Sequence, residues 1–211
     1  RDRSPSRGLG DVYKRQIDTP TSGSIVINGV NLEQLSDTGA ADFRRDNLGF
    51  IFQEYFLLDS LTIRENISVP LTLQKLPYKK IEKMVQSLAE RFGIASQLDK
   101  YPNELSGGQR QRASAARAIV KQPSILFADE PTGALDSNSA TELLKTLKEA
   151  NEELHTTILM VTHDAYAASF ANRILIFKDG SIIRELLKQD ADRRTFYEAI
   201  AQEVAKLDTE R

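Results

Sequence analysis

The stretch that decides the fold is ILFADEP at residues 125–131. Four apolar residues run into the carboxylates Asp129 and Glu130, a pattern typical of a buried strand of a parallel sheet that ends at a ligand site. Adjacent side chains on a strand point to opposite faces, so the two carboxylates can serve different atoms. We predict that Asp129 holds Mg²⁺ and that Glu130 is a general base toward an attacking water. The structural alternative is a pair of solvated carboxylates before a turn.

Strands and helices alternate after this stretch. The pattern predicts, in order, a helix from Ser137 to about Asn151, a strand at Thr157–Val161, a short helix from Asp164 and a strand at Arg173–Phe177. Such alternation is typical of an α/β fold with a mostly parallel sheet and helices on both faces. The turn at residues 178–181 predicts an antiparallel strand at Ile182–Leu186, and a last amphipathic helix is expected at about residues 192–207.

The N-terminal half combines two short strands with a helix-rich segment. Strands are expected at Ser24–Asn28 and Leu48–Phe52. Thr62 followed by Glu65 is a capping box that starts a helix interrupted before Pro77. Further helices are expected at Tyr78–Phe92 and from about Gly107 to Lys121. Together they predict a helical subdomain over about residues 57–121.

Composition excludes several classes of function. The chain has 211 residues, no Cys, two His and a net charge of −2, which excludes a disulfide scaffold and a thiolate metal site and gives no reason to expect a nucleic-acid partner. No apolar run approaches the roughly 18 residues that cross a bilayer, so no direct membrane insertion is expected. Residues 1–16 carry +3 and lack periodicity. We expect them to be a disordered or foreign leader, which leaves −5 on a domain at residues 17–211.

The strongest local motif is LSGGQ at residues 105–109. Ser106 is a natural N-cap, and Gly107 and Gly108 leave the backbone N–H groups of a helix N-terminus open. Such an end binds anions, so residues Ser106 to Gln109 are predicted to bind a terminal phosphate. The alternative is an ordinary glycine-bearing loop capped by serine.

Three more polar residues follow apolar segments at equivalent places. Gln53 could order the metal and its water, and His163 could donate to the γ-phosphate. Each has a structural alternative: Gln53 as a surface amide, Asp136 as the N-cap of the helix from Ser137, and His163 as the cap of the next helix. For Asp136 we expect the capping role in addition to any functional one. His155 is expected at a solvated helix end, without a catalytic role.

Gln53, LSGGQ, ILFADEP, GALD at residues 133–136 and TH at residues 162–163, in this order, resemble an ATP-binding-cassette (ABC) ATPase, the nucleotide-binding subunit of ABC transporters. The resemblance implies a P-loop NTPase-like α/β fold with an inserted helical subdomain and an antiparallel β addition. It also implies ATP and Mg²⁺ as cofactors. The site residues that it implies are the Q-loop Gln53, the signature residues Ser106, Gly107, Gly108 and Gln109, the Walker B pair Asp129 and Glu130, the D-loop Asp136 and the switch His163.

The same resemblance implies the partners. A second ATPase subunit completes the site in a head-to-tail dimer, and a membrane-embedded permease docks on the helical stretch between Leu57 and Asp99. The chain is therefore expected in the cytoplasm, peripheral on the inner face of the bacterial membrane. The apolar edge at residues 55–58 fits such docking, and the alternative is that these residues are core.

The C-terminal third of the sequence resembles one subgroup of this family. THDAYAASFANRILIFKDGSI at residues 162–182, followed by RRTFYEAI, resembles the ATPases of bacitracin-type exporters of antimicrobial peptides. EPTGALD is shared with lipoprotein-release and macrolide-export relatives. Chromosome-maintenance and DNA-repair members fit less well, because the chain has no long insertion before the signature and no cysteine.

One motif of the family is absent. None of the eleven glycines is followed by Lys, so the chain has no G-x-x-x-x-G-K-[ST] phosphate-binding loop. We expect that the N-terminal part of the domain has been replaced by the leader. Two hypotheses follow: a shortened form of an ATPase that powers a peptide exporter, or a catalytically inactive fragment that offers its signature loop to an intact partner. Negligible ATP turnover is expected for the chain as it stands.

Overall fold

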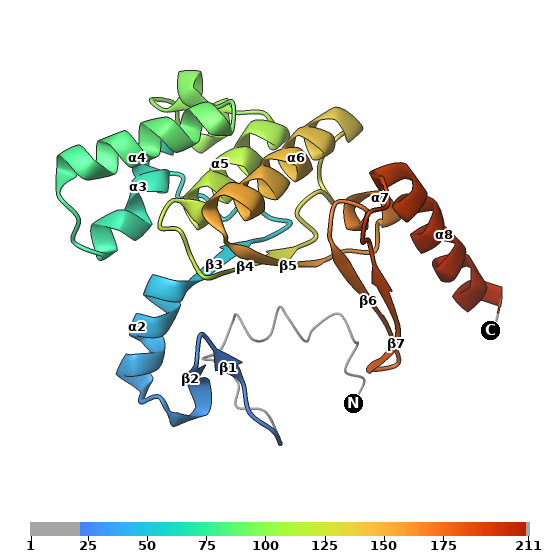
Figure 1. Ribbon diagram of the computed structural model, residues 1–211. Coiled ribbons are helices and arrows are strands. Elements are labelled where there is room, and N and C mark those ends of the chain that lie inside the picture. Colours follow the sequence, from blue (N-terminus) through green and yellow to red (C-terminus); the bar gives the residue numbers. More distant parts are fainter. Residues whose placement is uncertain (1–21, 210–211) are drawn as a thin grey trace, which may run out of the picture.

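The computed structural model describes residues 22–209, so the predicted leader lies outside the described residues. The centre is a parallel sheet of β3 (Leu48–Ile51), β4 (Ile125–Asp129) and β5 (Thr157–Val161), in the order β3-β4-β5 (Figure 1). The register pairs Ile51 with Ala128 and Ala128 with Met160. The predicted mostly parallel sheet is confirmed.

Helices cover one face of this sheet. Figure 1 shows α5 (Gly107–Ile119) and α6 (Ser137–Leu154) above the strands, with α3 (Ile63–Leu73) and α4 (Tyr78–Arg91) beside them. Gly49 lets α5 approach closely, because a Cβ there would lie 2.7 Å from the carbonyl oxygen of Ala118. Inward-facing side chains of the strands and helices form one core, which includes Ile51, Ile63, Ile119, Leu126 and Leu143.

The prediction of helices on both faces is wrong for residues 22–209. The strand order follows the chain without reversal, so right-handed crossovers place both connections on the same side. The other face carries Phe50, Phe127, Leu159 and Val161, which line an open cavity of about 530 Å³. The rings of Phe50 and Phe127 stack with centroids 5.2 Å apart.

A hairpin and a helix at the N-terminal end border that cavity. The hairpin joins β1 (Val26–Ile27) to β2 (Val30–Asn31) through Asn28 and Gly29, which have positive φ angles of 51° and 77°. A 3-10 turn (Leu32–Gln34) and α2 (Asp37–Asn47) follow. The sequence did not predict α2, because Phe43 is its one buried side chain.

The helical segment matches its predicted bounds closely. The capping box of α3 forms as expected: the Thr62 hydroxyl accepts from the Glu65 N–H, and the Glu65 carboxylate accepts from the Thr62 N–H. Pro70 lies inside α3 and does not end it. Two 3-10 turns, Ala95–Gln97 and Pro102–Glu104, lead from α4 to α5.

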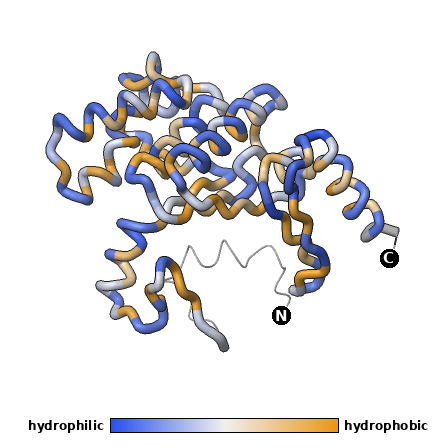
Figure 2. The backbone as a smooth tube through the Cα atoms, in the orientation of Figure 1, coloured by the Kyte–Doolittle hydropathy of each residue, from blue (hydrophilic) through white to orange (hydrophobic). Residues whose placement is uncertain are grey.

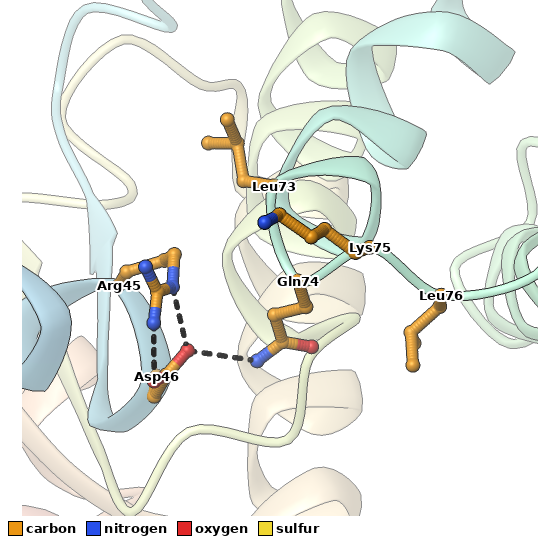
Figure 3. Close-up of a pocket in the computed structure, with 6 residues that line it drawn as sticks. All are labelled: Arg45, Asp46, Leu73, Gln74, Lys75 and Leu76. Carbon is orange, nitrogen blue, oxygen red and sulfur yellow. Dashed lines mark hydrogen bonds and ion pairs between the residues drawn. The ribbon is translucent and has the colours of Figure 1, made fainter.

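A hollow of about 470 Å³ lies between the end of α2 and the end of α3 (Figure 3). Asp46 accepts hydrogen bonds from the Arg45 guanidinium at 2.9 and 2.8 Å and from the Gln74 amide at 3.5 Å. The bond from Arg45 holds the pKa of Asp46 below its usual range. None of the predicted site residues lines this hollow, and its contacts serve to hold α2 against the helical segment.

The C-terminal part adds α7 (Ala165–Ala168), an antiparallel hairpin of β6 (Arg173–Lys178) and β7 (Ser181–Leu187), and α8 (Arg193–Thr209). Phe196 and Ile200 of α8 are buried, and the Arg193 guanidinium lies 4.9 Å from the ring centroid of Tyr166. Figure 2 shows apolar residues gathered along the strands, whereas the helices alternate between apolar and polar residues. Among residues 22–209, no helix combines the length and the apolar character needed to cross a bilayer.

Candidate functional site

The ends of β4 and β5 bring Glu130 and His163 together. The Glu130 N–H donates to the Val161 carbonyl at 2.9 Å, which extends the ladder between the strands by one bond. The Glu130 carboxylate accepts from the His163 N–H at 2.8 Å and from the Thr162 hydroxyl at 3.1 Å. His163 Nδ1 lies 2.7 Å from Glu130 Oε1, and because the carboxylate accepts, Nδ1 donates.

These bonds hold Glu130 in an uncommon backbone conformation. Its φ is +44°, in the left-handed region that few non-glycine residues adopt. Such residues cluster at functional sites, where the surrounding contacts compensate the strain. The Glu130 side chain is only 21% exposed. The position is therefore fixed by both backbone and side-chain contacts.

His163 is the solvent-exposed partner of this pair, since its side chain is 86% exposed. The hydrogen bond that His163 donates to Glu130, and then the negative charge of Glu130, raise the pKa of His163. The alternative that His163 caps the next helix is wrong, because Asp164 does so: its carboxylate accepts from the Tyr166 N–H at 2.8 Å. His163 thus remains available to interact with solvent or a ligand.

Asp129 faces away from that pair. It lines the open cavity beside Phe127, while Glu130 contacts the end of β5, so the two carboxylates serve different sides as the sequence predicted. Burial, and then the charge of Glu130, raise the pKa of Asp129. Within residues 22–209, no hydrogen bond or ion pair compensates the charge of Asp129.

This environment fits a cation. An oxygen donor without a partner beside a second carboxylate is the donor chemistry that Mg²⁺ takes in nucleotide sites, where phosphates and waters complete the shell. Among the described residues, no group of three or more His, Cys, Asp or Glu could hold a metal on its own. The protein donors present therefore fit an ion that is held mainly by a ligand.

Gln53 follows β3 and lies against the turn after Glu130. A Cβ at Gly133 would be 3.1 Å from Gln53 Nε2, so the glycine leaves the room that the amide occupies. Gln53 is exposed, as the alternative of a surface amide required, but it packs on the loop that carries the carboxylates. The ends of β3, β4 and β5 thus bring Gln53, Asp129, Glu130 and His163 to one edge of the sheet.

The signature residues begin α5, where the predicted cap is present. The Ser106 hydroxyl accepts from the Gln109 N–H at 3.3 Å, and the Ser106 N–H donates to the Gln109 side chain at 3.0 Å. The N–H groups of Gly107 and Gly108 stand in the first turn, where no intrahelical acceptor exists. The predicted serine cap is confirmed, and phosphate binding at this helix end stays a prediction.

Both signature glycines also leave room for neighbouring side chains. A Cβ at Gly107 would lie 2.9 Å from Tyr55 Oη, and one at Gly108 would lie 2.7 Å from Ser139 Oγ. The Ser139 hydroxyl donates to Asp136 at 2.7 Å, and Asp136 also accepts from the N–H groups at the start of α6. These bonds, chiefly from Ser139, lower the pKa of Asp136. The predicted capping role of Asp136 is confirmed.

The predicted residues therefore form two groups. One is at the edge of the sheet, and the other joins Ser106–Gln109 to Asp136. Among residues 22–209, no hydrogen bond links Glu130 to residues 106–109. His155, predicted at a solvated helix end, is the exposed residue that follows α6, with φ +54°.

Gln111 is a buried residue of the site that the sequence analysis missed. It is 1% exposed and donates to the carbonyls of Phe52 and Pro131, both at 2.8 Å. A signal was present, because Gln111 shares a helical stripe with Ala115 and Ala118.

Comparison with known proteins agrees with this geometry. A sequence model of the ABC transporter family matches residues 15–133, a range that includes Gln53, the signature and both carboxylates. The chain belongs to the ABC transporter family. It is thereby an ATP-binding subunit of a transport system. Members of the ABC transporter family hydrolyse ATP.

Three relatives extend this result. The bacitracin export ATP-binding protein BceA of Halalkalibacterium halodurans is 53% identical over 184 residues, which are 87% of this chain and 73% of that protein. The macrolide export ATP-binding/permease protein MacB of Vibrio parahaemolyticus is 44% identical over 81% of this chain and 26% of its own length. A dimeric structure of the ATP-binding cassette MJ0796 in a post-hydrolysis state, bound to ADP and Pi, superposes with a TM-score of 0.73 at 36% identity, covering 81% of this chain and 75% of that one.

Proposed function

We propose that the parent protein of this chain is the ATP-hydrolysing subunit of an exporter of antimicrobial peptides or related amphiphiles, acting on the cytoplasmic face of a bacterial membrane. The observation that carries the chemistry is Glu130, a carboxylate held at the end of β4 by the backbone and side chain of His163. The 53% identity to a bacitracin export protein supports the peptide substrate.

In this proposal Glu130 is the general base that orients and deprotonates the attacking water. Both carboxylate oxygens accept hydrogen bonds here, one from Thr162 and the other from His163. Among residues 22–209, Oε2 accepts only from Thr162, so it keeps a lone pair for the water, while the exposed ring of His163 can turn from Glu130 toward the γ-phosphate. The rotation costs little packing, because the ring is 86% exposed.

Asp129 and Gln53 are the residues that would hold Mg²⁺, with the phosphates of ATP as further ligands. The bound ion supplies electrostatic stabilisation of the charge on the transferred phosphoryl group. The unpaired, partly buried carboxylate of Asp129 supports this role. Ser106, Gly107, Gly108, Gln109 and Asp136 are proposed to complete a nucleotide site in the partner subunit of a head-to-tail dimer.

The proposed permease contact is the segment after Gln53. Phe56 is 58% exposed and Leu58 is 49% exposed, so the alternative that the whole apolar edge is core does not apply to these two residues. Arg117 fixes the segment by donating to the Phe56 carbonyl at 2.7 Å. An exposed aromatic residue on an anchored loop is suited to an apolar partner surface.

Two alternatives have their own support. The 44% identity to a macrolide export protein supports a macrolide-export or lipoprotein-release type system instead of peptide export. The absence of a Gly-Lys pair anywhere in the sequence supports an inactive fragment, because no lysine-bearing loop cradles the phosphates. We therefore propose that the 211-residue chain alone has negligible ATP affinity.

The test compares the chain with a version extended upstream by the phosphate-binding segment of BceA from Halalkalibacterium halodurans. Magnesium-dependent ATPase activity is expected only in the extended protein. Glu130→Gln in that protein should abolish turnover while ATP still binds and promotes dimers. Full turnover of Glu130→Gln would refute the assignment of the base, and activity of the unextended chain would refute its proposed inactivity. Protection of a sensitive strain against bacitracin but not a macrolide, with the cognate permease, would separate the two export systems.

A further inference from the structure

We propose that Gln111 is a positioning residue that joins the ends of β3 and β4 and fixes Gln53 relative to Glu130. One nitrogen, Gln111 Nε2, donates to the Phe52 carbonyl and to the Pro131 carbonyl, both at 2.8 Å. Phe52 directly precedes Gln53, and Pro131 directly follows Glu130. The inference rests on the proposed function, since it concerns the residues assigned there to hydrolysis.

The bridge lies where the two strands cease to pair. The last register pair of β3 and β4 is Ile51 with Ala128, and beyond it the chains separate toward Gln53 and Glu130. A buried carbonyl needs a donor, and the register of β3 and β4 ends at that pair. The Gln111 amide supplies one N–H to each of the Phe52 and Pro131 carbonyls, so a side chain of α5 replaces the next step of the ladder.

The orientation of the amide follows from its neighbours. Both are carbonyl oxygens, which only accept, so the NH₂ end of Gln111 must face them. Gln111 Oε1 is then buried without a hydrogen-bond partner among the described residues. A buried acceptor without a donor lowers stability. The two hydrogen bonds of the bridge explain why a glutamine lies here despite its unsatisfied oxygen. Packing alone does not explain it.

The same helix also holds the far side of Gln53. Arg117 donates to the carbonyls of Tyr55 and Phe56, and the Arg110 guanidinium lies 5.0 Å from the centroid of the Tyr55 ring. The segment around Gln53 is thus anchored to α5 on both sides. Gln111 also donates to the Pro131 carbonyl in the loop after Glu130, so it sets the spacing between the two residues.

The first experiment measures the bridge in the 211-residue chain by NMR. Scalar couplings across hydrogen bonds are expected from Gln111 Nε2 to the carbonyl carbons of both Phe52 and Pro131. Gln111→Met keeps a similar shape without donors and should shift the backbone amides of Gln53 and His163. Ser114→Ala is the matched control, because Ser114 is equally buried on α5 and its hydroxyl has no partner among the described residues. Its shifts should stay near Ser114.

The absence of both couplings would overturn the proposal. So would Gln111→Met shifts confined to α5. The couplings of the unsubstituted chain decide the question even where a variant fails to fold.

The second experiment uses the upstream-extended protein. A positioning role predicts that Gln111→Met lowers kcat at least tenfold and changes KM for ATP less than twofold, whereas Ser114→Ala changes neither by twofold. Equal kcat values in Gln111→Met and the unsubstituted protein would overturn the proposal. An unsubstituted extended protein without ATPase activity would refute the proposed function instead, while the couplings would still test the bridge.

Discussion

Gly49→Ala should destabilise the protein, although alanine usually improves on glycine in a strand. Gly49 lies in β3 and has no positive φ, so the backbone itself accepts alanine and would gain about 0.5–1 kcal/mol from reduced chain entropy. The added Cβ, however, would lie 2.7 Å from the Ala118 carbonyl oxygen and 2.9 Å from Leu126 Cδ1 and Pro123 Cγ. The first of these atoms is the backbone of α5, which cannot turn away.

The magnitude follows from the two opposing effects. Overpacking a core costs about 1–3 kcal/mol, because the helix must move off the sheet. We expect a net loss of about 1–2 kcal/mol in the free energy of unfolding. With a urea m-value of about 2 kcal/mol/M, the unfolding midpoint should fall by about 0.5–1 M.

Urea unfolding followed by circular dichroism tests this, with Gly39→Ala as the matched control. Gly39 lies in α2, where the nearest atom to an added Cβ is the Ser36 hydroxyl at 3.3 Å, and helix propensity favours alanine by up to about 1 kcal/mol. The same substitution should therefore raise the midpoint at Gly39 and lower it at Gly49. A Gly49→Ala midpoint equal to or above that of the unsubstituted chain would mean that α5 does not pack on β3 as closely as described.

Three further outcomes are expected. Glu130→Gln should lower the pKa of His163 toward 6.5 in an NMR titration. Because the folded-state pKa of His163 is raised, its contact with Glu130 adds stability at low pH, and this stability is lost as pH rises through that pKa. An unchanged pKa of His163 would refute the pairing. Burial lowers the pKa of Lys121 to about 8, so the unfolded state binds more protons above that pH and the free energy of unfolding should rise between about pH 8 and 10.5. Lys121→Met should remove this rise when urea unfolding is repeated across that pH range. The same dependence of stability on pH in both proteins would contradict the burial of Lys121. Thr62→Ala removes the cap of α3 and should lower the free energy of unfolding by about 1 kcal/mol, measured by urea unfolding. Thr72→Ala lies away from the cap and should lower it by under about 0.5 kcal/mol. Equal losses in the two variants would count against the capping box.

The sequence predicted the strands that carry the site because their signals are local. An apolar run ending in polar residues defined β4 and β5 almost to the residue, and Asp129, Glu130 and His163 lie at their ends as expected. Helix α2 was missed because a single buried residue, Phe43, gives no periodic stripe. The one-sided cover of the sheet was missed because it depends on strand order, which periodicity does not report.

Gln111 was missed in the sequence for a different reason. In the run from Gln109 to Arg112 every residue is polar, so the only sequence signal for burial of Gln111 is that it shares a helical stripe with Ala115 and Ala118. Gln111 is nevertheless buried, because its partners are two carbonyls at the ends of distant strands. Such a partner is visible only once the strands are paired, since 59 residues separate Gln111 from Phe52.

Helix α5 links Ser106–Gln109 to the strand ends at Glu130, two places that no hydrogen bond joins directly among residues 22–209. Its N-terminus carries Ser106, and about one and a half turns further, about 7.5 Å along the axis, Gln111 contacts both strand ends. In the proposed head-to-tail dimer, the phosphate at Ser106 belongs to the nucleotide of the partner subunit, whereas Gln53 and Glu130 serve the subunit's own nucleotide. A hydrogen-bonded helix moves as a unit, so a shift of its N-terminus toward a phosphate displaces Gln111 and with it both strand ends. Hydrolysis in the extended protein should then be cooperative in ATP, and Gln111→Met should bring the Hill coefficient toward that of independent sites while Ser114→Ala leaves it unchanged.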